Sequence, residues 1–321
     1  MRLGWQHADF EALASLWNST VPAKYPIDAG LLKQNTVDSP VFDWGASALE
    51  VMDDQVLGFI AIKRSANPLL YKGPSYDQAH ISALVCVNGE CGIDLLAYAK
   101  SVLRPRGVDR LVFGQDSRHF WPGCPNDCAR LKDLLTVSGF QPGSEAVDLE
   151  ADITGYDDSS FDAVLAEHNA HVRPATAGDL PALFQFLHKD FPGRWEFDVK
   201  HKVDAEGRSD FVTVLDVNGT VAGFALLQDA SHSLPIAGAV WKGDLGDSWC
   251  TLGPIGVSKT VRGKGLGDAL LAKSLGHLKR QGFRRCLIDW TTLVDWYGKH
   301  GFSVTRTYTP MTLRLDSEVR R

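Results

Sequence analysis

The 321-residue sequence has no apolar run near the ~20 residues that a membrane-spanning helix needs. It also has no excess of basic residues: 39 aspartates and glutamates outnumber 33 lysines and arginines, so the net charge is -6. A protein that binds nucleic acid generally needs a basic face to meet the phosphates. We therefore expect neither a membrane nor a nucleic acid as a partner. The N-terminal stretch MRLGWQHADFEAL has no apolar signal-peptide core, which favours a cytoplasmic location.

Cysteine pairs at zinc-binding spacing are absent as well. None of the six cysteines forms a CxxC pair. Cys124 and Cys128 lie close together in a loop that contains proline and glycine, but no second Cys or His pair accompanies them. We expect free thiols in a reducing cytoplasm and no metal.

What the chain does contain is a weak internal repeat. The stretches HADFEALASLWN (7–18) and AGDLPALFQFLH (177–188) share an aspartate followed by apolar residues at helical spacing. Asp9 and Asp179 stand where an N-cap is expected, with a side-chain oxygen that accepts the first free N–H groups of a helix. Each half of the chain is therefore predicted to open with a similar helix.

Strand patterns repeat in the same order. LEVMDDQVLGFIAI (49–62) and VTVLDVNGTVAGFALL (212–227) each predict a strand, a polar turn and a strand. HISALVCV (80–87) and WCTLGPIGV (249–257) are apolar strands, each followed by a loop with glycine and an amphipathic helix. Strands and helices that alternate in this way predict two α/β domains with mixed sheets.

The boundary between the two halves falls in an acidic stretch. Residues 145–170 read as the last strand of the first half followed by a linker. A chain of this length is comfortable for two domains of roughly 150 residues each. We expect one domain over residues 1–155 and another over residues 171–321.

The most informative segment is KTVRGKGLGDALLAKSL (259–275), in which glycines and basic residues precede a helix. Two common phosphate-binding loops do not fit it. A Walker A loop needs Ser or Thr after its lysine, and Lys264 is followed by Gly265. A dinucleotide-binding GxGxxG that starts at Gly263 needs a third glycine where Asp268 stands.

The pattern Arg262-x-x-Gly265-x-Gly267, after a strand that ends at Val257, resembles the pyrophosphate loop of the GNAT acyltransferase superfamily, [Q/R]-x-x-G-x-[G/A]. The order of the flanking segments resembles that family over about residues 172–313. The resemblance implies two tandem GNAT-like domains and acetyl-CoA as the acyl donor, with its pyrophosphate bound by backbone N–H groups at a helix N-terminus. The residues implied to bind it are Ile255, Gly256, Val257, Arg262, Gly263, Lys264, Gly265, Leu266, Gly267 and Asp268.

The first half resembles the same fold but departs from it at this loop. Its counterpart, VNGECGIDLL (87–96), is shorter, contains no Arg or Lys, and places Glu90 where a pyrophosphate would lie. Like charges at short distance repel. We therefore interpret the first domain as a degenerate copy that does not hold CoA.

In this family an amine usually attacks the thioester directly, so the site must polarise the carbonyl, take the amine proton and protonate the thiolate. The resemblance implies a strand splay that frees a backbone N–H near Ile255 to Val257 for the thioester oxygen. Tyr297, four residues before a Gly-Phe pair as in the family, is the expected acid, because its hydroxyl with a pKa of about 10 is neutral at pH 7. Asp289 is the expected base; its alternatives are a cap of the following turn, or a base that acts through water.

Two aromatic loops are candidates for binding the acceptor, SRHFWPGCP (117–125) and FPGRW (191–195). The residues concerned are His119, Trp121, Arg194, Trp195 and Glu196. The first loop either seals a domain interface or helps to form the acceptor pocket. For Glu196 the alternative is a solvated loop carboxylate.

The function predicted from these features is an acyl-CoA-dependent N-acyltransferase, most simply an N-acetyltransferase, that acts on a small amine. An acidic chain with aromatic and carboxylate candidates suits a small cationic acceptor. The alternative is a non-catalytic acyl-CoA sensor. A nucleotide-dependent kinase lacks the Ser or Thr that this loop would need for Mg²⁺. The sequence leaves monomer and homodimer open.

Overall fold

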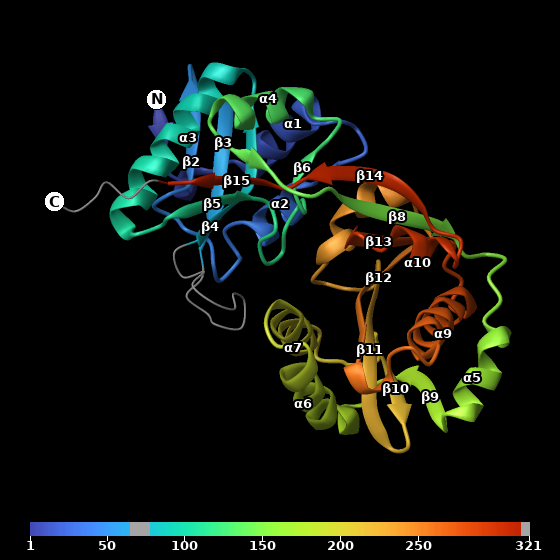
Figure 1. Ribbon diagram of the computed structural model, residues 1–321. Helices are drawn as coiled ribbons and strands as arrows, with labels where there is room; N and C mark the ends of the chain where they lie inside the picture. Colours follow the sequence, from blue (N-terminus) through green and yellow to red (C-terminus); the bar gives the residue numbers. More distant parts are fainter. Residues whose placement is uncertain (65–77, 316–321) are drawn as a thin grey trace. The chain divides into compact units, whose positions relative to one another are not determined.

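The computed structural model describes residues 1–64 and 78–315, which divide into two compact units (Figure 1). The described part of the first unit comprises residues 1–64, 78–147 and 306–315, and that of the second comprises residues 148–305. Mixed sheets with parallel and antiparallel pairs, together with helices, make up both units. The predicted α/β fold class is therefore confirmed.

The sheet of the second unit contains the strands that the sequence predicts in that half. Its strands are β8 (Ala146–Asp152), β9 (Ala170–Pro174), β10 (Val212–Val217), β11 (Thr220–Asp229), β12 (Trp249–Val257), β13 (Arg285–Thr291) and β14 (Ser303–Thr309). Their order across the sheet is β14-β8-β13-β12-β11-β10-β9. β9 to β12 pair antiparallel, whereas β12 and β13 pair parallel.

Helices cover both faces of this sheet. The helical segments are η4 (Ser159–Phe161), α5 (Asp162–Glu167), η5 (Ala177–Asp179), α6 (Leu180–Asp190), α7 (Arg194–Glu206), η6 (Ala237–Trp241), α8 (Lys242–Leu245), η7 (Lys259–Val261), α9 (Leu266–Arg280) and α10 (Val294–Gly298). Figure 1 shows α6 and α7 on one side of β10 and β11, and α5 and α9 on the other.

Side-chain alternation along β10 builds the two halves of this core. Val212 and Val214 belong to a cluster with apolar residues of α6 and α7. Thr213 lies between them, and its hydroxyl is 2.8 Å from that of Ser274 on α9. Successive side chains of a strand point to opposite faces, so β10 contacts a different helix layer on each side. The apolar face predicted for α9 is buried, as listed here: Leu270, Leu271, Ser274, Leu275 and Leu278.

The two predicted helix starts have different outcomes. Asp9 caps α1 (Phe10–Thr20), and its Oδ1 accepts the N–H groups of Glu11 and Ala12. In the second half the cap is Thr176, and Asp179 is the third residue of a capping box whose Oδ2 accepts the Thr176 N–H at 2.7 Å. Asp179 does stand at the N-cap position of α6, as predicted, but its side chain makes no capping bond there, because it takes part in the capping box one short turn earlier.

The sheet of the first unit has the order β1-β2-β3-β4-β5-β15-β7. Its strands are β1 (Arg2–Leu3), β2 (Ala48–Met52), β3 (Gln55–Lys63), β4 (Gln78–Cys86), β5 (Arg110–Phe113), β7 (Gln141–Pro142) and β15 (Met311–Arg314). The helical segments, besides α1, are η1 (Trp5–His7), α2 (Ala29–Asn35), α3 (Gly89–Leu103), η3 (Arg104–Arg106) and α4 (Ala129–Val137). The short β6 (Cys124–Pro125) pairs with Tyr308 and Thr309 at the end of β14.

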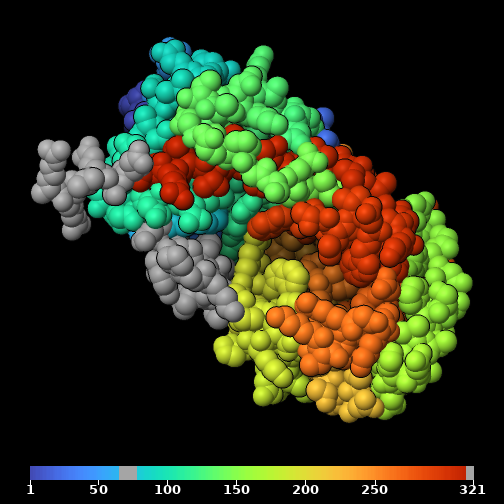
Figure 2. Space-filling view, viewed as in Figure 1, coloured from blue at the N-terminus to red at the C-terminus, as the bar shows by residue number. Residues whose placement is uncertain are grey.

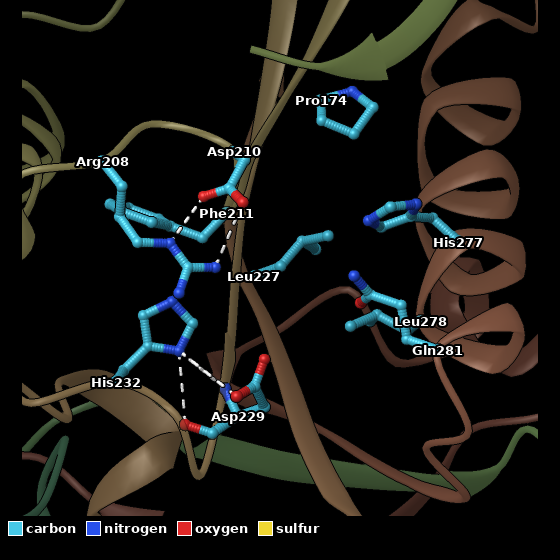
Figure 3. A pocket seen from close by; sticks show the side chains of 10 residues that line it. All are labelled: Pro174, Arg208, Asp210, Phe211, Leu227, Asp229, His232, His277, Leu278 and Gln281. Atoms are coloured by element: carbon cyan, nitrogen blue, oxygen red, sulfur yellow. Dashed lines mark hydrogen bonds and ion pairs between the residues drawn. The ribbon is translucent and has the colours of Figure 1, made fainter. Parts of the chain in front are cut away.

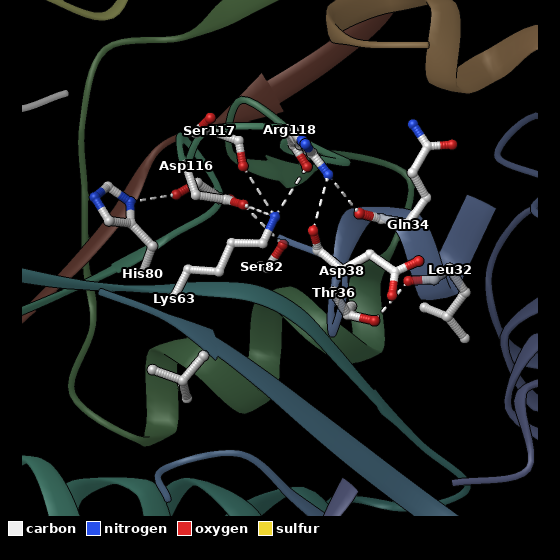
Figure 4. Close-up of polar contacts among 12 residues, drawn as sticks. Leu32, Gln34, Thr36, Asp38, Lys63, His80, Ser82, Asp116, Ser117 and Arg118 are labelled. Atoms are coloured by element: carbon white, nitrogen blue, oxygen red, sulfur yellow. Dashed lines mark hydrogen bonds and ion pairs between the residues drawn. The ribbon is translucent and has the colours of Figure 1, made fainter. Parts of the chain in front are cut away.

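A buried ion pair fixes the loop that follows β5 (Figure 4). Lys63 and Asp116 have fully buried side chains, and Lys63 Nζ donates to Asp116 Oδ2 at 2.7 Å. The same ammonium donates to the carbonyls of Ser117 and Arg118, and the Ser82 hydroxyl donates to Asp116. Burial is the largest single effect and would raise the pKa of Asp116, but the charges of Lys63 and His80 and the hydrogen bond from Lys63 together outweigh it and lower that pKa. Loss of either partner would leave a buried charge, so we interpret the pair as structural.

The last strands of the two halves are exchanged. β8, expected to end the first domain, lies between β13 and β14 in the second sheet, and β15 lies between β5 and β7 in the first. Glu150 of β8 accepts Arg285 Nε at 2.5 Å and the Thr305 hydroxyl at 3.0 Å. The units therefore do not follow the expected ranges 1–155 and 171–321. The halves repeat one plan, and a final strand can complete either sheet.

Candidate active site

The strands β12 and β13 separate halfway along their length. Their parallel pairing runs from Trp249 opposite Arg285 to Thr251 opposite Leu287, where it ends. From there to Val257, β12 continues its pairing with β11. A gap therefore opens between β12 and β13, at the end of β12 from which the glycine loop begins.

Backbone N–H groups of β12 point into this gap. The Ser258 N–H donates to the carbonyl of Ala222 in β11 at 2.8 Å. Since alternate residues of a strand direct their N–H groups to opposite neighbours, those of Val257 and Ile255 point away from β11. The Val257 carbonyl agrees with this, because it accepts Arg262 Nε at 3.3 Å. The segment in which an N–H group was expected to bind a thioester oxygen thus has the required direction.

The loop that follows is a run of exposed backbone. Residues 262–265 are exposed, and Gly263 and Gly265 have φ of +75° and +73°. This left-handed conformation favours glycine, and it turns neighbouring N–H groups toward a common concavity that can bind an anion. Gly265 is also the N-cap of α9 and provides no side-chain hydrogen bond. The first N–H groups of α9 and the helix dipole therefore remain available for an anion.

The other residues of the loop differ in their exposure. Lys264 is exposed between the two glycines, whereas Leu266 is buried beneath the helix start. A Cβ added at Gly267 would lie 3.9 Å from Val257 and 4.0 Å from Trp296, which is ordinary contact. The predicted loop residues therefore gather at one place in the second unit.

Tyr297 and Asp289 both lie at the gap. A Cβ added at Gly253, where β12 leaves β13, would be 3.6 Å from Asp289 Oδ1. Tyr297 on α10 is 5% exposed, and burial, the nearby Asp289 carboxylate and the Cys286 thiol raise the pKa of Tyr297. Its hydroxyl is therefore protonated at neutral pH, as a proton donor must be. The two residues expected to transfer protons are close enough for the charge of one to affect the other.

Aromatic and charged residues line the side of the gap toward α7. The Arg194 guanidinium lies 5.0 Å from the centre of the Trp290 ring and bonds Asp198 at 3.0 Å through Nε. Trp195, 39% exposed, stacks on Phe191 with the ring centres 5.2 Å apart. Figure 2 shows the second unit hollowed between the yellow segment of α7 and segments coloured orange to red.

Glu196 is placed differently from its neighbours. Its side chain is 1% exposed, and Oε1 accepts Lys200 Nζ at 2.6 Å and contacts His188 Nδ1 at 3.2 Å. A carboxylate that is buried and paired in this way is not presented to an acceptor. The prediction that Glu196 contacts substrate from a loop is corrected: the segment is the first turn of α7, and Glu196 holds that helix in place.

His119 and Trp121 lie in the first unit. His119 is 2% exposed, and Trp121 is fully buried. The Trp121 ring stacks on Trp17 with the ring centres 4.5 Å apart and the planes at 15°, and it also stacks on Phe113. These contacts place Trp121 in the core of the first unit, which corrects the expectation that its ring helps to form an acceptor pocket. Aromatic composition does not distinguish a packed loop from a binding loop.

The counterpart of the glycine loop in the first unit is closed. β4 ends at Cys86 and α3 begins at Gly89, with Asn88 as its N-cap. The Asn88 side chain accepts the Cys91 N–H at 2.9 Å, and Glu90 lies in the first turn. The donors that α9 leaves open are thus partly used in α3, beside a negative charge.

A separate hollow lies at the far end of α9 (Figure 3). Its volume is about 80 Å³, and its lining includes His277 and Gln281 from the last turns of that helix. At 1.5 Å per residue, His277 is roughly 16 Å along the helix from its start. Arg208 at this hollow pairs with Asp210 at 2.6 Å. The hollow is not part of the gap at β12.

The described part of the chain has neither a metal-binding cluster nor a membrane-spanning helix. Over residues 1–64 and 78–315, no three His, Cys, Asp or Glu side chains are grouped so as to hold a metal ion. No helix in this part of the chain is both long enough and apolar enough to span a bilayer.

Comparison with known proteins gives one family match. Residues 180–302 match the family model described as Acetyltransferase (GNAT) family. This segment contains β12, the glycine loop, α9 and α10. No curated protein sequence matches the chain.

Solved structures resemble the chain over nearly its whole length. One is a glucosamine N-acetyltransferase region in a fungal multi-domain β-N-acetylglucosaminidase, with a TM-score of 0.85 and 18% identity over 98% of this chain and 38% of that chain. Another is a GCN5-related N-acetyltransferase from Sphaerobacter thermophilus, with a TM-score of 0.69 and 15% identity over 98% and 95% of the two chains. A tandem GNAT protein from the clavulanic acid biosynthesis pathway has a TM-score of 0.63 and 14% identity over 96% and 94%. At these identities the likeness establishes the fold alone.

Proposed function

Because residues 180–302 form a domain of the acetyltransferase (GNAT) family, we propose that this protein is an acyl-CoA-dependent N-acetyltransferase that acts on a small amine. The observation that most supports the proposal is the start of α9, where no side chain caps the first N–H groups. This helix start follows Gly263 and Gly265 and lies next to the gap at β12. An anion-binding helix start beside strand N–H groups that lack a strand partner suits a pyrophosphate attached to a thioester.

The proposed division of labour follows from these positions. The backbone from Arg262 to Gly267 binds the pyrophosphate of acetyl-CoA, the acyl donor. An N–H group of Val257 or Ile255 donates to the thioester oxygen and stabilises the charge that develops on it. Tyr297 then donates its hydroxyl proton to the departing thiolate sulfur.

Asp289 is the proposed base. It lies beside Gly253 at the gap and is half-buried. The carboxylate takes a proton from the attacking amine, directly or through water. The electron pair of that nitrogen forms the new C–N bond, and the C–S bond breaks toward the sulfur that Tyr297 protonates.

The acceptor proposed is a small cationic amine. Trp195 and Trp290 are partly exposed, Asp198 pairs with the Arg194 guanidinium that lies over the Trp290 ring, and the Asp289 carboxylate lies beside Gly253 at the gap. Aromatic faces with nearby carboxylates suit an ammonium-bearing ligand. Amino sugars are the first class to test because the fungal region of similar fold is a glucosamine N-acetyltransferase. Polyamines and amino-acid derivatives follow. We propose that neither a nucleic acid nor a membrane is a partner and that the enzyme acts in the cytoplasm as a monomer or homodimer.

The test is release of free CoA from acetyl-CoA across a panel of these amines, with Gly265→Val as the control of weakened CoA binding. The proposal expects amine-dependent release that Gly265→Val lowers strongly when acetyl-CoA is subsaturating. Binding of acetyl-CoA without release by any amine would instead favour a non-catalytic acyl-CoA sensor. Failure of the native protein to bind acetyl-CoA would overturn both functions.

A further inference from the structure

The Asp268 side chain links the start of α9 to the helix of Tyr297. Asp268 lies in the first turn of α9, and its Oδ1 accepts the indole N–H of Trp296 at 2.9 Å. The same oxygen is 3.3 Å from Nε2 of His300. Trp296 precedes Tyr297 on α10, and His300 follows that helix. One carboxylate therefore joins the helix start at the glycine loop to the helix that carries the expected acid.

His300 extends this connection to the segment before α5. Its side chain is 4% exposed, and Nδ1 is 2.6 Å from the Tyr156 hydroxyl. The Phe161 ring stacks on it at 5.7 Å and 22°. An ionised carboxylate only accepts hydrogen bonds, so we assign the ring proton to Nε2, facing Asp268. The Tyr156 hydroxyl, the two ring nitrogens of His300 and Asp268 Oδ1 thus form one continuous chain of polar contacts.

An acidic side chain in the first turn of α9 does not help to bind an anion there. A carboxylate in the first turn repels a pyrophosphate at the same helix N-terminus. Asp268 is nevertheless tied to two side chains, one of which is buried. Only its backbone N–H remains for the loop role that the sequence predicts. The carboxylate must therefore be explained by what it holds.

We propose that Asp268 is a positioning residue of the transferase function proposed above, on which this inference rests. Asp268 holds α10 against the start of α9 through Trp296 and His300. The backbone that binds pyrophosphate and the hydroxyl of Tyr297 thereby keep a fixed relation. CoA binding at the loop therefore changes the environment of the Trp296 indole. Weakening the hydrogen bond between Trp296 and Asp268 lowers kcat more than it lowers CoA affinity.

The test that needs no acceptor is a titration of the ¹⁵N-labelled full chain with CoA, followed by the indole N–H signals. The Trp296 signal is the one that Trp296→Phe removes. CoA should shift this signal in the native protein, and Asp268→Ala, which removes the acceptor oxygen, should abolish the shift. Asp295→Ala is the matched control: it removes an exposed carboxylate from the same helix as Trp296 and should respond like the native protein. Calorimetry on the same samples should give CoA dissociation constants that are not raised by Asp268→Ala.

The kinetic readout uses the amine that gives turnover. Trp296→Phe keeps an aromatic ring but removes the donor, so kcat should fall about tenfold while KM for acetyl-CoA changes less than about twofold. CoA binding that leaves the Trp296 signal unmoved, a native-like shift in Asp268→Ala, or equal changes in kcat and KM would overturn the inference. Absence of CoA binding by the native protein would overturn the proposed function, and the inference with it.

Discussion

Val164 of α5 lies directly behind Gly265: a Cβ added at Gly265 would be 3.3 Å from Val164 Cγ1. Gly265 also has φ of +73°, a conformation that a β-branched residue rarely adopts. Space and backbone conformation therefore both require glycine at the N-cap of α9. Lys264, by contrast, is exposed and meets neither constraint.

This relationship gives the first prediction. Gly265→Val should weaken CoA binding far more than Lys264→Ala does. Strain of about 1–3 kcal/mol at such a residue corresponds to roughly a 5- to 150-fold rise in Kd. Loss of one exposed cation should cost about 0.2–1 kcal/mol, which is less than about sixfold. Isothermal calorimetry measures the CoA dissociation constants of the two variants. Equal small effects would show that backbone N–H groups are not the main contacts of the pyrophosphate.

Tyr297 gives the second prediction. Tyr297→Phe removes only the hydroxyl, so kcat should fall by roughly 10²-fold or more while CoA affinity stays nearly unchanged. The comparison requires conditions in which chemistry limits the rate. Unaltered kcat under those conditions would reassign Tyr297 to packing against Trp296 and Phe302, whose rings it contacts.

The third prediction concerns pH. Burial, with the charges of Asp289 and Cys286, raises the pKa of Tyr297 above the usual value of about 10. The protonated form is the one that donates, so Tyr297 should cause no loss of kcat up to about pH 10. By linkage, the neutral hydroxyl contributes stability that is fully present below about pH 10 and is lost as pH rises through the raised pKa. Phenolate absorbance of the native protein and of Tyr297→Phe should therefore coincide up to about pH 10; an earlier ionisation that Tyr297→Phe removes would contradict this.

The strands and the glycine loop of the second unit could be predicted from the sequence because each depends on neighbouring residues. The alternation of side chains along β10 predicts a strand, and the spacing of leucines on α9 predicts a helix with one buried face. The positive φ of Gly265 likewise follows from a short pattern. The same pattern predicts that Asp268 belongs to the loop, whereas the bond of Asp268 to Trp296 joins residues far apart in sequence. Nothing local signals that bond, apart from an acidic residue where an anion should bind.

The exchange of β8 and β15 could not be predicted for a related reason. Both are short strands in which apolar and polar residues alternate, at equivalent places in the repeat, so either fits either sheet. Their sequence patterns predict strands but not partners. The prediction that Trp121 lines an acceptor pocket was wrong for a different reason. A loop rich in aromatic residues predicts buried surface, but it does not indicate whether a ligand or the protein core covers that surface.

The fourth prediction tests the exchanged strand. Met311 of β15 is 1% exposed and lies opposite Phe113 and Pro142. Met311→Ala should therefore lower the unfolding free energy of the first unit by about 2–5 kcal/mol. Met52→Ala is the matched control, since Met52 is 57% exposed in the same unit and should cost less than about 0.5 kcal/mol. Urea unfolding measures both, and CoA should not protect the transition that Met311→Ala lowers. Equal effects would show that β15 contributes no core to the first sheet.

The last prediction is that each chain binds one CoA. Both units have the same type of sheet, so fold alone would predict two sites, but ligands are bound by sites rather than by folds. The start of α3 is capped by Asn88 and places Glu90 where phosphate charge would lie, whereas the start of α9 is open. Repulsion between charges a few ångströms apart, on the order of 1–4 kcal/mol in wet surroundings, removes about one to three decades of affinity. Because a fragment of residues 1–155 would lack β15, the titration must use the full chain. Calorimetry should give a stoichiometry near one, and Gly265→Val should weaken this single binding event by the factor given in the first prediction. A stoichiometry near two, or a full-affinity site that survives Gly265→Val, would show that the first unit also binds CoA.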